Sequence, residues 1–143
     1  MAEYKKPGRV TILMGRAMML ATKIGFSPAG AWTLAVKGRS SGEERTAPVN
    51  PLDVYGVRYL VAPRGETQWV RNLRAAPEGE LRLGKKRQSI RVQELADSEK
   101  PALIAAYLKR WGNVTRSQFG TTKDPSASEL ERLASRTPVF RIV

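Results

Sequence analysis

Two basic loops are the stretches of this chain whose residue types suit anion binding. The first, Lys37 to Arg45, combines cations with two glycines and two serines, and the second begins at Arg64-Gly65. Glycines let backbone N–H groups approach a ligand, and arginine offers a fork of donors that matches phosphate or carboxylate oxygens. Thr67 is predicted to cap a short helix reaching Leu73, whose positive N-terminal end would point at the anion. The alternative is a solvated hairpin turn followed by a surface helix.

Composition restricts the chemistry that this chain can perform. Its 143 residues suffice for one domain with a real core but not for two of ordinary size. The chain has no cysteine and no histidine, which removes disulfides, thiol nucleophiles, imidazole bases and the usual zinc sites. We therefore expect no metal centre, and an enzyme of this composition would rely on a cofactor. The net charge of +12 predicts an anionic partner, for which nucleic acid, an acidic membrane surface and a polyanionic cofactor all qualify.

The elements that must position the two loops are predicted to be short strands. Apolar and polar residues alternate over 31–37, the period of a half-buried strand, and further strands are expected at 46–52, 57–62, 79–83, 87–95 and 139–142. Short turns rather than helical crossovers join them. This favours an antiparallel barrel over a parallel sheet.

The C-terminal third is predicted to be largely helical. A helix should begin at Asp97 or Ser98, continue to Trp111 and end at Gly112. A long loop is expected over 112–128, then a short helix over 128–135. We interpret residues 1–143 as a single domain.

An apolar segment near the N-terminus is predicted to form an amphipathic helix. It covers residues 10–24, follows a flexible basic lead-in at 1–9, and carries cations that recur every seven residues. At 1.5 Å per residue its length is about 22 Å, too short to cross a bilayer. It is either a core helix over one mouth of the barrel, or a lid or membrane-surface helix that delivers apolar substrate past Met18 and Met19. No secretory signal is apparent, so we expect a cytoplasmic protein, with membrane association through this helix left open.

Several motifs together resemble the deazaflavin-dependent nitroreductase family, also described as class A flavin/deazaflavin oxidoreductases. They are Gly38-Arg-Ser-Ser-Gly-Glu-Glu-Arg45, then Pro48, then Arg64-Gly65, then Trp69-Val-Arg-Asn-Leu-Arg-Ala-Ala-Pro77. The closing Thr137 to Val143 is similar to the last strand of that family. The resemblance implies a mainly β fold with flanking helices, a flavin-reductase-like split β-barrel, and binding of the 8-hydroxy-5-deazaflavin coenzyme F-420.

The resemblance also implies a set of coenzyme contacts. The first basic loop would bind the anionic part through Lys37, Arg39, Ser40, Ser41, Gly42 and Arg45. Ser40 stands where the family usually has lysine, which would shift one phosphate contact to Lys37. Pro48 and Val49 would lie along the deazaflavin ring, and a second contact set would comprise Arg64, Gly65, Trp69 and Asn72. Trp111 and Phe119, with the two methionines, are predicted walls of the substrate pocket.

The implied activity is hydride transfer to an electron-poor acceptor, which could be a quinone, an enone or a nitro compound. The residues from Trp111 to Phe119 replace the tyrosine-rich segment of nitroimidazole-reducing relatives, so a quinone or an activated alkene is the better expectation. The proton would come from solvent or from Tyr107, whose alternative role is core packing. The expected partner is a small apolar molecule, and a homodimer is open because barrels of this kind often dimerise.

Two other functions remain as alternatives. A small basic barrel could bind nucleic acid, which requires stacking aromatics beside the charged surface. Apart from Tyr55, Tyr59 and Trp69, the basic loops have no aromatic residues near them, so nucleic-acid binding is not expected. The other alternative is a flavin-mononucleotide- or haem-binding relative with the same barrel.

Overall fold

The structure is a computed structural model that describes residues 31–119 and 125–143, with the side chains of 112–119 left undescribed. The predicted lead-in at 1–9 and the predicted helix over 10–24, with Met18 and Met19, lie outside the described residues.

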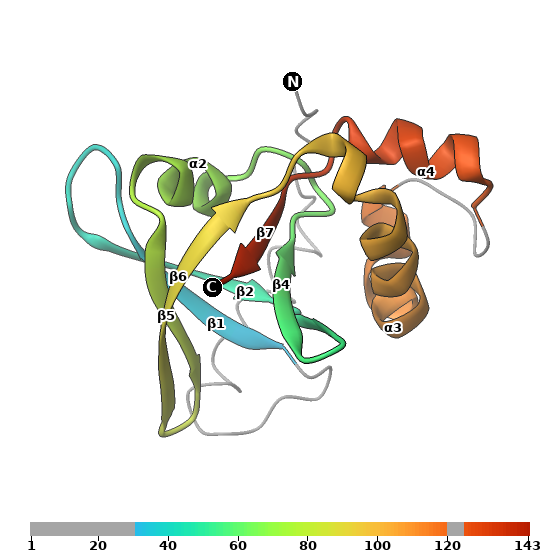
Figure 1. Cartoon of the computed structure of the whole chain (residues 1–143). Coiled ribbons are helices and arrows are strands. Elements are labelled where there is room, and N and C mark those ends of the chain that lie inside the picture. Colours follow the sequence, from blue (N-terminus) through green and yellow to red (C-terminus); the bar gives the residue numbers. More distant parts are fainter. Residues whose placement is uncertain (1–30, 120–124) are drawn as a thin grey trace.

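Seven antiparallel strands form one sheet that curls into a half-barrel (Figure 1). They are β1 (Trp32–Lys37), β2 (Glu44–Val49), β3 (Leu52–Val54), β4 (Val57–Val61), β5 (Glu78–Leu83), β6 (Lys86–Glu94) and β7 (Val139–Ile142). Their order across the sheet is β2-β1-β5-β6-β7-β4-β3, and every neighbouring pair is antiparallel. The predicted antiparallel architecture is confirmed.

The two edge strands of the sheet are consecutive in the chain. Only Asn50 and Pro51 separate β2 from β3, so the two edges meet at this connection, which we call the seam. The prediction of one return strand over 46–52 was wrong on this point. Pro48 sits within β2, where the missing N–H is tolerated because an edge strand need not donate on its outer side.

The described helices are α2 (Gln68–Ala75), a 3-10 turn η1 (Asp97–Glu99), α3 (Pro101–Phe119) and α4 (Ala127–Ala134). Gly112 does not end α3, so the predicted loop over 112–128 was wrong in its first eight residues. Glycine inside a helix costs only about 1 kcal/mol relative to alanine, and α3 buries an apolar face with helical spacing at Ile104, Tyr107, Leu108 and Trp111. Among the described helices, none is both long and apolar enough to cross a membrane.

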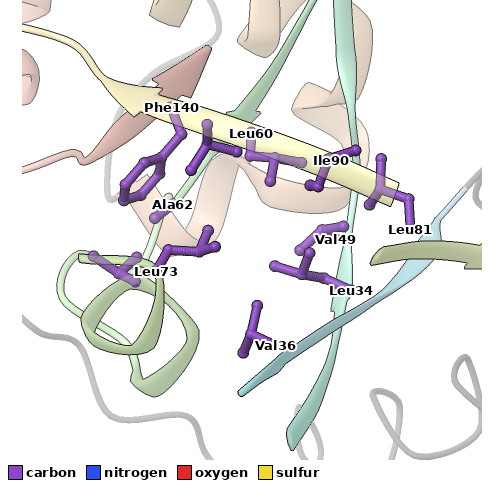
Figure 2. Packing of buried hydrophobic residues seen from close by; sticks show 11 residues of the cluster. Leu34, Val36, Val49, Leu60, Ala62, Leu73, Leu81, Ile90 and Phe140 are labelled. Carbon is purple, nitrogen blue, oxygen red and sulfur yellow. The ribbon is translucent and has the colours of Figure 1, made fainter. Parts of the chain in front are cut away.

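Two hydrophobic clusters stabilise the fold. The first fills the half-barrel and includes Leu60 and Phe140 (Figure 2). The second lies between the outer face of the sheet and helices α3 and α4, and includes Val61 and Val139. Side chains alternate along strands, so neighbouring residues of β4 and β7 contribute to different clusters. This arrangement fixes α3 against the barrel beside β3.

Candidate functional site

The first basic loop is the tight connection between β1 and β2. The Gly38 amide donates to the Glu43 carbonyl at 2.7 Å, and the Gly42 amide donates to the Gly38 carbonyl at 2.9 Å. Gly42 has φ +74°, a conformation that favours glycine. The Ser41 hydroxyl accepts from the Glu43 amide at 3.1 Å. The loop therefore satisfies many of its own amides.

Two amides at the tip of this loop are available to a ligand. Within the described part of the chain, the backbone N–H groups of Ser40 and Ser41 have no hydrogen-bond partner. Lys37 and Arg45 are exposed on either side of the loop. Arg45 lies 3.8 Å from Glu43 with 60% of its side chain exposed, so this ion pair is weak. The loop thus combines free amides with accessible cations.

Arg39 joins the first loop to helix α2. Its backbone amide donates to Asn72 Oδ1 at 3.1 Å, and its Nη1 donates to the same oxygen at 2.9 Å. Its Nη2 donates to Gln68 Oε1 at 2.9 Å. Asn72 is only 3% exposed, so its side chain anchors the loop from inside the fold. The structure thereby brings together the two basic segments that were predicted from the sequence to bind an anion. Three of the five guanidinium N–H donors of Arg39 remain for a ligand.

The second basic loop is the turn that leads into α2. Gly65 has φ +89°, and its amide donates to the Ala62 carbonyl at 3.0 Å. Arg64 is half-buried in this turn. Thr67 occupies the predicted N-cap position, but its side chain makes no capping hydrogen bond, which corrects the predicted role of its hydroxyl. Thr67 Oγ1 is instead buried without a hydrogen-bond partner among the described residues.

Arg74 holds the second loop, helix α2 and strand β6 together. Its Nη1 donates to Glu66 Oε1 at 2.6 Å, and its Nε and Nη2 donate to the two carboxylate oxygens of Glu94 at 2.9 and 2.7 Å. Hydrogen bonding from Arg74 lowers the pKa of Glu66 below its ordinary value. Sequence reasoning did not find this network, because its partners are far apart in the chain.

Three predicted coenzyme contacts, Pro48 and Val49 along the ring and Trp69 in the second contact set, lie in different environments. Pro48 is exposed on β2, whereas the Val49 side chain is buried in the first cluster. Trp69 packs against that cluster, with its ring centroid 6.0 Å from that of Phe140 and the planes tilted by 50°. Pro48 is therefore the exposed member of this set, Trp69 is half-buried against the core, and Val49 is buried in it. Their roles as coenzyme contacts stay predictions.

A cleft of about 570 Å³ opens at the seam, between the start of β1, strand β3 and helix α3. We call it the seam cleft. It is lined by Trp32, Pro51, Leu52, Asp53, Val54, Arg58, Ala106, Lys109, Arg110 and Trp111. Among these lining residues, Trp111 is the one that was predicted from the sequence to form a wall of the substrate pocket. Its Nε1 donates to the Pro51 carbonyl at 3.2 Å, which ties α3 to the seam.

The predicted proton donor, Tyr107, lies in the core, and the side chain of Phe119, a predicted pocket wall, is not described. Tyr107 is 1% exposed and belongs to the second cluster, so its ring is core packing and its hydroxyl does not face open solvent. Its role as proton donor stays a prediction. Phe119 is the last residue of α3, and its side chain lies outside the described part.

The donors gathered around the two loops suit an elongated anionic ligand. Four cations and the two serine amides come from the β1–β2 loop and the turn before α2. Arginine forks and free amides are the usual partners of phosphate and carboxylate groups. Within residues 31–119 and 125–143, no cluster of acidic side chains suited to a metal ion is found.

Comparison with known proteins identifies relatives. The family model described as F420H(2)-dependent quinone reductase matches residues 12–125. No curated protein sequence matches the chain significantly. A solved structure described as an F420-H2 dependent reductase is 19% identical, with 80% of this chain and 94% of that chain covered and a TM-score of 0.56.

Two further solved structures have the same fold. One, described as a domain-swapped dimer, is 18% identical, with 94% of this chain and 96% of that chain covered and a TM-score of 0.59. The other, a heme binding protein from Mycobacterium smegmatis, is 14% identical, with 96% of this chain and 52% of that chain covered and a TM-score of 0.54. These likenesses confirm the predicted flavin-reductase-like split β-barrel.

Proposed function

Because the chain belongs to the F420H(2)-dependent quinone reductase family, we propose that it transfers hydride from reduced coenzyme F-420 to an electron-poor acceptor, a quinone or an activated alkene in preference to a nitro compound. The observation that carries this proposal is the family match over residues 12–125, which includes both basic loops. The absence of histidine and cysteine supports it, because the hydride chemistry then belongs to the coenzyme.

The two basic loops would hold the anionic part of the coenzyme. Arg39 is already oriented by Asn72 and Gln68, and its remaining donors would face the phosphodiester together with the Ser40 and Ser41 amides. Arg64 and Gly65 would bind from the other side, where they form the turn before α2. A site whose donors are held by the fold before binding loses little entropy when the ligand arrives.

Strand β2 would direct the ring away from the basic loop. In the register of the sheet, Arg45 lies opposite Val36 and Pro48 lies opposite Thr33. Three residues along a strand correspond to about 10 Å and place the two side chains on opposite faces of β2. A ligand held at Arg45 would therefore pass over the open edge of β2 to reach the exposed surface of Pro48. When bound, the coenzyme supplies a hydride, and a proton from solvent completes the reduction of a quinone to a hydroquinone. The protein would contribute orientation of donor and acceptor.

A haem or flavin mononucleotide is the alternative occupant. The fold is shared with a heme binding protein from Mycobacterium smegmatis, which supports this alternative at the level of fold. Histidine and cysteine thiolate are the common axial ligands of haem iron, and this chain has neither. The composition therefore favours the deazaflavin over haem.

Titration and turnover together test the proposal. We expect purified protein to quench deazaflavin fluorescence with saturation at micromolar coenzyme, and to ignore flavin mononucleotide, haemin, NADH and NADPH. Reduced coenzyme with menadione or cyclohexenone should give steady-state turnover. Turnover with a nicotinamide and none with the deazaflavin would contradict the proposal.

The assembly is proposed to be a homodimer. One relative in fold is described as a domain-swapped dimer, which supports this. Light scattering at several protein concentrations measures the mass directly, and a mass equal to that of one 143-residue chain at all concentrations would contradict it.

A further inference from the structure

We propose that the seam cleft is the acceptor site and that it selects flat aromatic acceptors bearing an acidic group, such as a carboxylate or a sulfonate. Calling the ligand an acceptor rests on the proposed function. The preference for a flat, anionic ligand rests on the cleft alone.

The walls of the seam cleft suit a planar ligand. Trp32 is half-buried, and Trp111 is 6% exposed with its Nε1 committed to the Pro51 carbonyl. Leu52, Val54 and Ala106 supply the remaining apolar surface. Each indole carries a guanidinium, since Arg58 Cζ lies 5.6 Å from the centroid of the Trp32 ring and Arg110 Cζ lies 3.9 Å from that of the Trp111 ring. A flat aromatic ligand would pack against these guanidinium groups and the accessible part of Trp32, which the core holds in place at little cost in side-chain entropy. A volume of about 570 Å³ is within the range of small-molecule sites.

The charges of the seam cleft are unbalanced. Asp53 forms an ion pair with Arg58, whose Nε and Nη2 donate to the two carboxylate oxygens of Asp53 at 2.8 and 3.2 Å. Hydrogen bonding from Arg58 lowers the pKa of Asp53, so this pair stays ionised at neutral pH. Lys109 and Arg110 have no carboxylate partner in the described part of the chain. Three cations and one carboxylate give the lining a net charge of +2.

Arg110 lies over the ring of Trp111 at the edge of the cleft. Its Cζ lies 3.9 Å from the centroid of the Trp111 ring. A guanidinium stacked on an indole keeps its N–H donors in its own plane, where they point outward to a carboxylate or sulfonate. Lys109 is its neighbour on the same exposed turn of α3. A ligand with one flat apolar part and one acidic group would satisfy both the indoles and these cations.

The seam cleft is distinct from the basic loop that would hold the coenzyme phosphate. Trp32 begins β1 and Lys37 ends it, and five residue steps along a strand correspond to about 16 Å. Trp32 pairs with Val49, which together with Pro48 is proposed to lie along the ring. Val49 is on the same face of the sheet as Trp32, whereas Pro48 points to the other face. The cleft thus adjoins the proposed ring position, and its cations are available to a second anion.

Binding of redox-inactive ligands tests the cleft without coenzyme. By isothermal titration calorimetry, we expect 2-naphthalenesulfonate to bind more tightly than 2-naphthalenemethanol, with sodium sulfate at equal ionic strength as a control. The double variant Lys109→Ala/Arg110→Ala should bind the sulfonate about ten- to a hundredfold more weakly than wild type, because hydrogen bonds to charged groups are removed. Its affinity for the neutral alcohol should stay within twofold of that of wild type. Lys86→Ala, an exposed cation outside the cleft, is the matched control. Equal affinity of wild type for both ligands, or unchanged sulfonate binding by the double variant, would overturn the inference.

Turnover tests whether the cleft is the acceptor site. With reduced coenzyme, the ratio of kcat/KM for 1,2-naphthoquinone-4-sulfonate to that for menadione should be at least tenfold lower in the double variant than in wild type. In wild type, 2-naphthalenesulfonate should inhibit competitively against 1,2-naphthoquinone-4-sulfonate. Sulfonate binding without competition would overturn the acceptor assignment. Absence of turnover with every acceptor would contradict the proposed function, while the calorimetry would still decide the ligand class of the cleft.

Discussion

Arg39 donates two hydrogen bonds to a single oxygen of Asn72, one from its backbone amide at 3.1 Å and one from Nη1 at 2.9 Å. Both residues were predicted as coenzyme ligands, and the structure shows that they first bind each other. The contact joins a loop of the sheet to a helix that begins 29 residues later at Gln68. Arg39 therefore positions the basic loop as well as carrying its charge.

Replacing Asn72 with leucine should destabilise the fold. The buried oxygen that accepts from Arg39 would be lost, and the Arg39 amide would lose its partner, so the free energy of unfolding should fall by about 1 to 3 kcal/mol. Urea denaturation measures this, and coenzyme affinity should fall in parallel because the loop is no longer fixed. Gln68→Ala removes an exposed acceptor and should change stability by under about 0.5 kcal/mol. A stable Asn72→Leu protein with unchanged coenzyme affinity would contradict the role given to this contact.

Replacing Arg64 with alanine should weaken coenzyme binding more than it weakens the fold. The expected loss is about 1.5 to 3 kcal/mol in binding, the range for hydrogen bonds to charged groups. Fluorescence titration gives the affinity, and raised salt should weaken wild-type binding as well. Arg91→Ala removes a cation that is 74% exposed on β6 and serves as the control. If the two variants bind alike, the second basic loop is not part of the coenzyme site.

Tyr107→Phe should retain turnover. The side chain is 1% exposed in the second cluster, so its ring contributes packing and the substitution preserves that ring. We expect kcat within about threefold of wild type, because orientation rather than a proton donor is proposed to carry the rate. Tyr107→Ala should instead lower the free energy of unfolding by about 3 kcal/mol or more, as for other buried aromatics. Abolition of turnover by Tyr107→Phe would identify it as the proton donor.

The Arg74 network should make stability depend on pH in the acid range. The pKa of Glu66 in the folded protein is lower than in the unfolded chain. Its contribution is therefore fully present above its ordinary pKa and is lost as the pH falls through the lower folded value. Arg74→Gln should be less stable than wild type by about 1 kcal/mol at pH 7, and this difference should shrink below about pH 4, near the ordinary pKa of glutamate. Urea midpoints at pH 3, 5 and 7 measure it, and a difference that is constant with pH would contradict the assignment.

Local patterns in the sequence predicted most of the strands. Alternation over 31–37 corresponds to β1, and the predicted strands over 79–83 and 87–95 correspond to the β5–β6 hairpin. The prediction that α3 ends at Gly112 was wrong, because it used only the local preference of glycine and not the packing of the helix against the sheet. Glycine weakens a helix, but burial of Ile104, Tyr107 and Trp111 against the sheet compensates within α3.

The sequence by itself limited the chemistry, since a chain without histidine or cysteine has no imidazole base and no thiol nucleophile, and its net charge of +12 predicts an anionic partner. Its motifs also identified the two basic loops. Only the tertiary structure decided which of these residues meet. Arg39 and Asn72 are 33 residues apart, and the seam cleft draws on β1, β3, β4 and α3. Periodicity and turn chemistry act over a few residues, whereas such contacts depend on how the whole sheet curls until its two edges meet at Asn50 and Pro51.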